Sequence, residues 1–252
     1  MVRQVGAPGQ RAVFSAAIAG EPYLAPVLGR DLAIWADNPG APVRLFTASG
    51  AALSLSGSGA TLCGCPGDEE ELLAFLRFAG VRSLLSTHPL AGQRETALCH
   101  RYALAPGQRL GGSLPPPPAD LVLDREPPMG EVAAFLFPGD SGRQDSLYTE
   151  GCAARARGMA RIWALRRAGQ ILSTVGAYAV LEGAAAMAMG CTHPSLRGRG
   201  IGGWLIARMA DDLAGEGLAV SLLCAPARCH FYERLGFAPA GPLWQYEFNE
   251  TE

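Results

Sequence analysis

The sequence contains no lysine, so arginine supplies all 21 of its basic side chains. A phosphate-binding loop of the Walker A type requires a lysine, and this class of nucleotide site is therefore excluded. Lysine is excluded from any catalytic role for the same reason. The formal net charge of −2 argues against a broad nucleic-acid surface, so we expect no nucleic-acid partner.

Long apolar runs are missing as well. No stretch reaches the roughly 18 uninterrupted apolar residues of a membrane span, and the opening residues, MVRQVGAPGQRAVF, lack the apolar core of a signal peptide. The seven cysteines are an odd number scattered through 252 residues, which is typical of a reducing compartment rather than of a disulfide framework. We therefore expect a cytoplasmic protein with no membrane partner.

The paired C-x-x-C spacing of zinc sites is also absent. Possible metal ligands lie close together as Cys63-x-Cys65, Cys99-His100 and Cys229-His230, but none of these segments has the spacing of a metal site. We expect no metal cofactor.

The most informative stretch is Cys191–Leu205, CTHPSLRGRGIGGWL. The run of small apolar residues at 183–192 predicts a buried strand, and apolar residues from Ile201 onward recur at helical spacing. The first N–H groups of a helix have no partners within the helix, and glycines let a phosphate approach them. Arg197 and Arg199 add positive charge. We therefore predict an anion-binding site in this turn.

Two other interpretations of the turn are open. Gly198, Gly200 and Gly203 satisfy the G-x-G-x-x-G pattern of a dinucleotide fold. That fold needs an acid at the end of the next strand, whereas the strand predicted at 219–224 ends in Cys-Ala-Pro. The remaining alternative is an ordinary glycine-rich turn with surface arginines.

Two motifs resemble one known family. The segment Arg197–Gly202, RGRGIG, resembles the R/Q-x-x-G-x-G/A signature of the GNAT superfamily of acyl-CoA-dependent N-acyltransferases, and Pro194 precedes it as in many members. Further along, Phe231–Phe237, FYERLGF, resembles the Y-x-x-x-G-F element that ends many GNAT domains. The resemblance covers about residues 127–252. It implies an α+β fold in which helices flank a mixed, mostly antiparallel sheet, and transfer of an acetyl group from acetyl-CoA to a primary amine.

The resemblance also implies roles for individual residues. Backbone groups of Gly190, Cys191 and Thr192 would pair with the pantetheine arm and the carbonyl oxygen of acetyl-CoA. Tyr232 matches the tyrosine that protonates the coenzyme A sulfur in many members, although it could instead be a half-buried aromatic that packs the C-terminal motif. The pyrophosphate would be held by Arg197, Gly198, Arg199, Gly200, Ile201, Gly202 and Gly203.

The sequence departs from the family pattern at Ala225, where many members carry an asparagine that contacts the cofactor arm. No general base stands out either, since Glu182, His193 and His230 each suit a structural role. Two functions therefore remain open. The first is an N-acetyltransferase, a monomer or homodimer acting on an amine of a small molecule or peptide. The second is a non-catalytic acyl-CoA-binding or regulatory module.

The clearest break in the sequence is the proline run within residues 111–120, GGSLPPPPAD, because consecutive prolines neither pair in a sheet nor continue a helix. We place a linker at residues 115–126, between a smaller α+β domain at 1–114 and a GNAT acetyltransferase domain at 127–252.

The first domain has its own predicted order of elements. Helical sequence with proline and glycine breaks at 11–36 precedes short strands at 43–47, 51–56 and 60–63. Asp68 then caps a helix, and a strand follows at 81–86. The apolar face of this helix is predicted to consist of Leu72, Leu73, Phe75, Leu76 and Phe78. This order resembles tandem GNAT proteins whose first half has lost its cofactor site, and the alternative is an independent small α+β domain.

Overall fold

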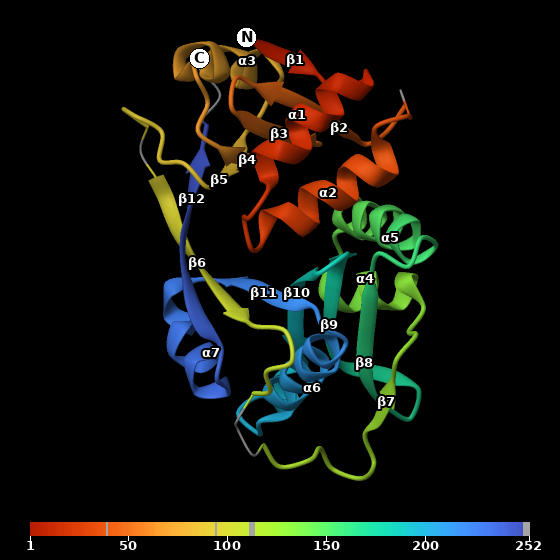
Figure 1. Cartoon of the computed structure of the whole chain (residues 1–252). Helices are drawn as coiled ribbons and strands as arrows, with labels where there is room; N and C mark the ends of the chain where they lie inside the picture. The colour runs from red at the N-terminus through yellow and green to blue at the C-terminus, as the bar shows by residue number, and fades with distance from the viewer. Residues whose placement is uncertain (39, 94, 111–113, 249–252) are drawn as a thin grey trace. The chain divides into compact units, whose positions relative to one another are not determined.

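The computed structural model describes residues 1–38, 40–93, 95–110 and 114–248 (Figure 1). Its internal contacts divide the chain into two compact units. Unit 1 comprises Met1–Arg101, Cys224–Cys229 and Ala240–Glu252, and unit 2 comprises Tyr102–Leu223 and His230–Pro239. The predicted linker at 115–126 falls within the range of unit 2, and its separation of two domains stays a prediction. Residues 111–113 of the predicted break lie outside the described residues.

Unit 1 is built on a mixed sheet with the strand order β1-β2-β3-β4-β5-β12. The strands β4 and β5 are parallel, and the other pairs with known register are antiparallel. The last strand of the chain completes this unit, since Trp244 of β12 lies opposite Ser86 of β5. The elements are β1 (Val2–Gln4), α1 (Pro8–Ile18), α2 (Leu24–Trp35), β2 (Val43–Ala48), β3 (Ala51–Ser56), β4 (Gly59–Gly64), α3 (Glu69–Phe78), β5 (Ser83–Ser86) and β12 (Ala238–Glu247).

Unit 2 contains a sheet with the order β7-β8-β9-β10-β11, in which β10 and β11 are parallel. The strand β6 (Glu95–Leu104) runs from the residues of unit 1 into those of unit 2. The elements of unit 2 are β7 (Val122–Asp124), α4 (Met129–Leu136), α5 (Ser141–Arg155), β8 (Arg161–Arg167), β9 (Gln170–Leu181), β10 (Ala184–Thr192), the 3-10 turn η1 (Pro194–Leu196), α6 (Ile201–Gly215), β11 (Ala219–Cys224) and α7 (Cys229–Leu235). The 3-10 turn η2 (Pro226–Arg228), between β11 and α7, falls in the range of unit 1.

The two units repeat one topology. Each runs strand, two helices, three antiparallel strands, one helix and a strand parallel to the one before that helix. The series β1, α1, α2, β2, β3, β4, α3, β5 therefore corresponds to β7, α4, α5, β8, β9, β10, α6, β11. This confirms the predicted α+β class with a mixed, mostly antiparallel sheet flanked by helices.

The central strand of each unit is buried on both faces. Consecutive side chains of a strand point to opposite faces of its sheet, and Ala51–Leu55 of β3 and Ser173–Ala179 of β9 are buried without interruption. Helices must therefore cover both sides of each sheet. No helix within the described residues is long and apolar enough to cross a membrane.

The helical stretch predicted at 11–36 is interrupted at one place only in the described structure, between Ile18 and Leu24. Pro26 and Gly29, which were expected to break it, both lie inside α2. Pro26 is tolerated because it stands in the first turn, where backbone N–H groups have no partner within the helix.

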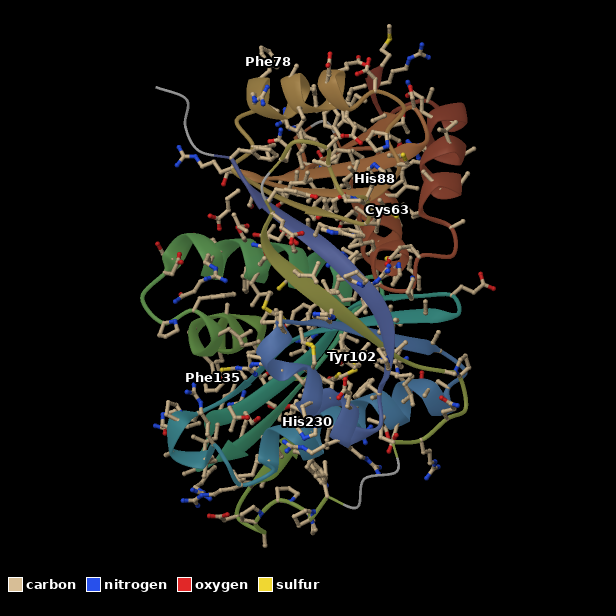
Figure 2. All side chains as sticks on the ribbon, turned by 90° about the vertical axis from the view of Figure 1, so that its left-hand side faces the viewer. Cys63, Phe78, His88, Tyr102, Phe135 and His230 are labelled. Atoms are coloured by element: carbon tan, nitrogen blue, oxygen red, sulfur yellow. The ribbon has the colours of Figure 1, made fainter. Side chains whose placement is uncertain are left out.

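Phe78 was predicted to belong to the apolar face of α3, and this is wrong. Leu72, Leu73 and Leu76 are buried, whereas Phe78 is 92% exposed and points away from the sheet (Figure 2). The reason is the helical period, since Phe78 lies about 200° around the helix from Leu76. The predicted cap is confirmed, because the Asp68 side chain accepts a hydrogen bond from the backbone N–H of Glu71 at 2.9 Å.

This difference along one helix gives a stability prediction. Leu76→Ala should lower the free energy of unfolding by about 2–5 kcal/mol, because it leaves a cavity under α3. Phe78→Ala, on the same helix, should change it by less than about 0.5 kcal/mol. Urea unfolding of both variants and the wild type measures these values. A loss for Phe78→Ala as large as that for Leu76→Ala would contradict the placement of this helix.

Candidate functional site

The site begins with an irregularity in β10. Its pairing with β9 shifts register between Ala188 and Cys191, and Met189 within the shift has a left-handed backbone with φ of 58°. A bulge of this kind bends a strand and leaves its extra residue unpaired. Beyond it, Cys191 and Thr192 pair again with Thr174 and Ser173 of β9.

On its other side, β10 separates from β11. Within the described residues, the last paired positions of the two parallel strands are Met187 and Leu222, although β10 continues to Thr192. The end of β10, which holds the predicted residues Gly190, Cys191 and Thr192, is therefore paired with one neighbouring strand and not with the other. Such an edge presents backbone N–H and C=O groups to an extended ligand.

The chain then turns into α6 through the predicted anion site. Gly198 and Gly200 both have φ of 75°, a left-handed conformation that favours glycine, and Gly200 is the residue before the helix. Ile201 is buried and anchors the first turn. Arg197 and Arg199 are exposed, and the Arg197 guanidinium donates from Nε to the backbone oxygen of Thr192 at 3.0 Å.

The start of α6 packs closely on β10. An alanine Cβ at Gly202 would lie 2.7 Å from Oγ1 of Thr192, which is closer than a real contact allows. That hydroxyl is held in place, because it lies 2.9 Å from Oγ of Ser173, and Ser173 also donates to the backbone oxygen of Cys191 at 3.1 Å. Gly202 is therefore required for close approach as well as for access to the helix N-terminus.

The predicted catalytic residue lies on α7, which packs near the same turn. A Cβ at Gly203 would lie 3.4 Å from Leu235 and 3.6 Å from Phe231, so α7 contacts the first turn of α6. Tyr232 is half-buried among aromatic rings. Its ring centroid lies 5.0 Å from Phe231, 6.0 Å from Phe237 and 6.0 Å from Tyr102.

Tyr102 is a residue that the sequence interpretation missed. It is buried, stacks on Tyr232 at an interplanar angle of 29°, and donates its hydroxyl to Glu233 at 2.8 Å (Figure 2). The strand β6 that carries Tyr102 was not predicted, although the alternation in ETALCHRYAL offered a signal.

The three residues considered as general bases, Glu182, His193 and His230, lie in different segments of the chain. Nδ1 of His193 lies 2.8 Å from Oγ of Ser195 in the turn, and His230 faces Glu233 across 3.8 Å on α7. Glu182 lies between β9 and β10. Ala225 immediately precedes η2. In the part of the chain that the structure describes, no group of three or more histidine, cysteine or acidic residues could hold a metal ion.

In unit 1 the parallel strands that correspond to β10 and β11 are β4 and β5, and their ends remain hydrogen-bonded to each other. The parallel strands β4 and β5 pair up to Leu62 and Ser86, and bonding continues beyond that pair. The N–H of Thr87 donates to the oxygen of Leu62 at 3.1 Å as part of that last pair, and beyond it the Thr87 hydroxyl accepts from the N–H of Gly64 at 2.8 Å. The strands of unit 1 thus stay joined at the level where β10 and β11 separate.

The two units also differ in the charge at the start of the corresponding helices, α3 and α6. The first turn of α3 carries Glu69, Glu70 and Glu71, whereas the first turn of α6 has no acid and follows two arginines. Carboxylates at a helix N-terminus repel another anion there. Within its described residues, unit 1 therefore lacks the free strand end and the positive charge that unit 2 has at the corresponding place.

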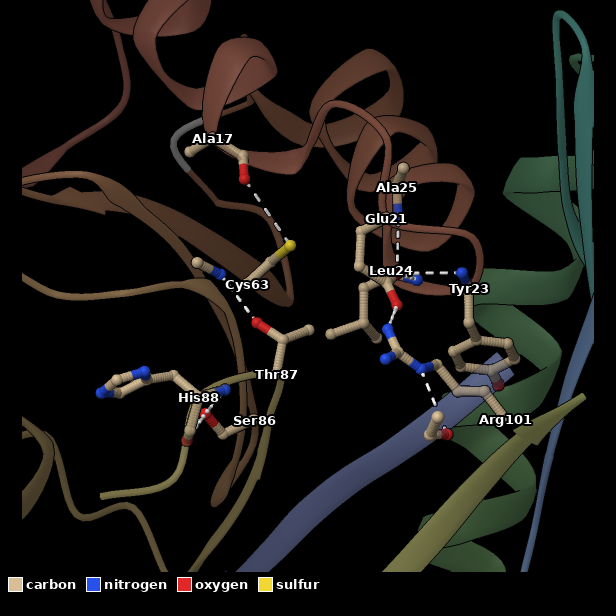
Figure 3. Close-up of polar contacts among 12 residues, drawn as sticks. Ala17, Glu21, Tyr23, Leu24, Ala25, Cys63, Ser86, Thr87, His88 and Arg101 are labelled. Atoms are coloured by element: carbon tan, nitrogen blue, oxygen red, sulfur yellow. Dashed lines mark hydrogen bonds and ion pairs between the residues drawn. The ribbon is translucent and has the colours of Figure 1, made fainter. Parts of the chain in front are cut away.

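Side chains of unit 1 occupy the space beside these strand ends (Figure 3). Glu21 forms a largely buried ion pair with Arg101 and accepts the backbone N–H groups at the start of α2, including that of Tyr23 at 2.9 Å. Sγ of Cys63 lies 3.7 Å from the backbone oxygen of Ala17. Burial, together with the negative charge of Glu21, raises the pKa of the Cys63 thiol to about 12.

Comparisons with known proteins agree with this geometry. An acetyltransferase (GNAT) domain model matches residues 158–239, which contain the bulged strand, the turn, α6 and α7. None of the curated proteins compared with the chain is significantly similar to it.

Several solved structures share the fold. A tandem GNAT protein from the clavulanic acid biosynthesis pathway is 15% identical, with a TM-score of 0.63 over 100% of this chain and 99% of that one. A Drosophila protein is 14% identical, with a TM-score of 0.67 over 99% of each chain. A GCN5-related N-acetyltransferase from Kribbella flavida is 17% identical, with a TM-score of 0.60 over 82% of this chain and 90% of that one. At these identities the likeness establishes the fold.

The repeated topology matches the fold of the tandem GNAT structure over the whole chain. Residues 158–239, which match the GNAT domain model, therefore resemble the acetyltransferase domain of that superfamily. The resemblance noted in the sequence motifs is thereby confirmed.

The contact between Gly202 and Thr192 gives a second prediction. Gly202→Ala should lower the free energy of unfolding by about 1–3 kcal/mol through overpacking. Thr192→Ala in the same molecule should restore part of that loss, because the hydroxyl that clashes is gone. Gly215→Ala is the control at the other end of α6, where a Cβ meets nothing within 4 Å. A loss in the double variant equal to the sum of the two single losses would contradict the close contact.

Proposed function

We propose that the protein is an acetyl-CoA-dependent N-acetyltransferase, cytoplasmic, that acetylates a primary amine of a small molecule or peptide. The observation that carries the proposal is the free edge of β10 beyond Met187, next to the glycine turn at the start of α6. Only in unit 2 do the described residues combine these two features.

The turn and the strand would hold the donor in two ways. The backbone N–H groups around Gly200 and Gly202, with the charges of Arg197 and Arg199, would bind the pyrophosphate. The backbone of Gly190–Thr192 would pair with the pantetheine arm as an added strand does. The same donors would polarise the thioester carbonyl, which is where negative charge develops when an amine attacks.

Tyr232 is the proposed general acid. Attack of the neutral amine on the carbonyl carbon forms the C–N bond, and loss of the C–S bond leaves a thiolate that takes a proton from the Tyr232 hydroxyl. Stacking on Tyr102 and edge contacts with Phe231 and Phe237 restrict the ring that would deliver this proton. The amine proton would leave through water, since no side chain among the described residues is placed as a base.

A second function rests on one specific observation. Ala225 cannot supply the side-chain contact to the cofactor arm that the family resemblance leads one to expect. A non-catalytic acyl-CoA-binding or regulatory module would keep the strand edge and the turn while lacking turnover. A screen of amine acceptors by thiol release from acetyl-CoA separates the two functions.

Charge in the turn gives a prediction for donor binding. Arg197→Ala should weaken coenzyme A binding by about tenfold or more, because a charge-assisted contact is worth about 1.5–3 kcal/mol. Isothermal titration measures the affinity. The control is Arg208→Ala, since Arg208 is exposed on α6 and pairs with Asp212 at 3.4 Å. Equal affinity in wild type and Arg197→Ala would refute this part of the assignment.

The acid role gives a prediction for turnover. Tyr232→Phe should lower kcat by about 10- to 10³-fold, because general acid catalysis is typically worth 10²- to 10⁴-fold and a thiolate leaves tolerably without it. Affinity for coenzyme A should change little, since the ring still packs. Tyr148→Phe, on an exposed tyrosine of α5, is the control. Wild-type turnover by Tyr232→Phe, with chemistry limiting the rate, would show the acid role to be wrong.

A further inference from the structure

Two cysteine side chains meet where β11 leads into α7. Cys224 is the last residue of β11 and Cys229 is the first of α7, and their Sγ atoms are 4.0 Å apart. The turn η2 between them folds the chain back, with the N–H of Arg228 donating to the oxygen of Ala225 at 2.9 Å. This local fold, rather than a distant contact, brings the two sulfur atoms together.

The separation is short enough for a covalent bond. A disulfide has an S–S distance of about 2.05 Å, so the two sulfur atoms would have to approach by about 2 Å. Both cysteines are free thiols in the structure.

The two thiols differ in their surroundings. Cys224 is 7% exposed, whereas Cys229 is partly exposed and is the one that an oxidant in solution can reach. Burial, with a further contribution from the neighbouring Cys229, raises the pKa of the Cys224 thiol to about 12. An oxidant should therefore react first at Cys229.

We propose that Cys224 and Cys229 form a dithiol modification site at which a hydroperoxide produces an intramolecular disulfide. In the first step the Cys229 sulfur attacks a peroxide oxygen, the O–O bond breaks, and a sulfenic acid forms with release of water. In the second step the Cys224 sulfur attacks the Cys229 sulfur and displaces the hydroxyl as water. Two thiols and one hydrogen peroxide give one disulfide and two water molecules, with two electrons passing from sulfur to the peroxide.

The disulfide would join the end of β11 to the start of the helix that carries Tyr232, three residues after Cys229. It would fix the connection through Ala225–Arg228 in one conformation. The modification itself does not depend on the proposed acetyltransferase activity, so its chemistry can be tested alone.

The test is peptide mapping after treatment with hydrogen peroxide. Free thiols are blocked with iodoacetamide, and the protein is cleaved after arginine. Cleavage separates the two cysteines, because Arg208, Arg228 and Arg234 release Met209–Arg228 with Cys224 and Cys229–Arg234 with Cys229. Each of these peptides holds a single cysteine. We expect the two to be recovered as one cross-linked species that dithiothreitol separates, with loss of both alkylated thiols.

Two variants act as controls. Cys229→Ser should abolish the cross-link and leave Cys224 fully alkylated. Cys65→Ser should leave the cross-link unchanged, because Cys65 is an exposed thiol at the end of β4 that contacts His88 at 3.7 Å. Recovery of both peptides separately from peroxide-treated wild type, or a cross-link from Cys224 to another cysteine, would overturn the proposal.

Discussion

The site depends on how far one pair of parallel strands stays joined. In unit 2, pairing between β10 and β11 stops at Met187 and Leu222, and the bulge at Met189 bends β10 away. In unit 1, the Thr87 hydroxyl after β5 bonds to the N–H of Gly64 in β4, beyond the last paired position at Leu62. Two units with the same topology therefore differ at the strand end where, in unit 2, an extended ligand could add to the sheet. An unpaired strand end keeps backbone donors and acceptors available, whereas a paired one has already used them.

Other contacts in unit 2 hold the start of α6 beside the free end of β10. Ser173 holds the hydroxyl of Thr192, and Gly202 lets the first turn of α6 rest against it. The helix N-terminus is thereby fixed beside the open strand, where its partial positive charge adds to that of the arginines. In unit 1 the corresponding helix begins with three glutamates, which suit the helix dipole and exclude an anionic ligand.

Much of this could be predicted from the sequence, because the signals are local. The small apolar strand before Pro194 and the helical spacing after Gly200 fixed the elements on either side of the turn, and the structure has both. Most strand positions followed from alternation and turn residues. The features that the sequence did not predict depend on contacts between residues far apart in the sequence. The strand β12 pairs with β5, joining Trp244 to Ser86, and no local pattern specifies such a partner. The exposure of Phe78 and the stacking of Tyr102 on Tyr232 likewise depend on which surfaces meet.

We propose that coenzyme A binds in unit 2, where the described residues combine a free strand end with a helix N-terminus. Amide hydrogen exchange measures it directly, since a ligand that pairs with backbone groups slows their exchange. We expect added coenzyme A to slow exchange at residues 188–192 and 197–203 and to leave the corresponding segment of unit 1, residues 62–71, unchanged. Protection of 62–71, or no change at 188–203 under saturating coenzyme A, would contradict the account.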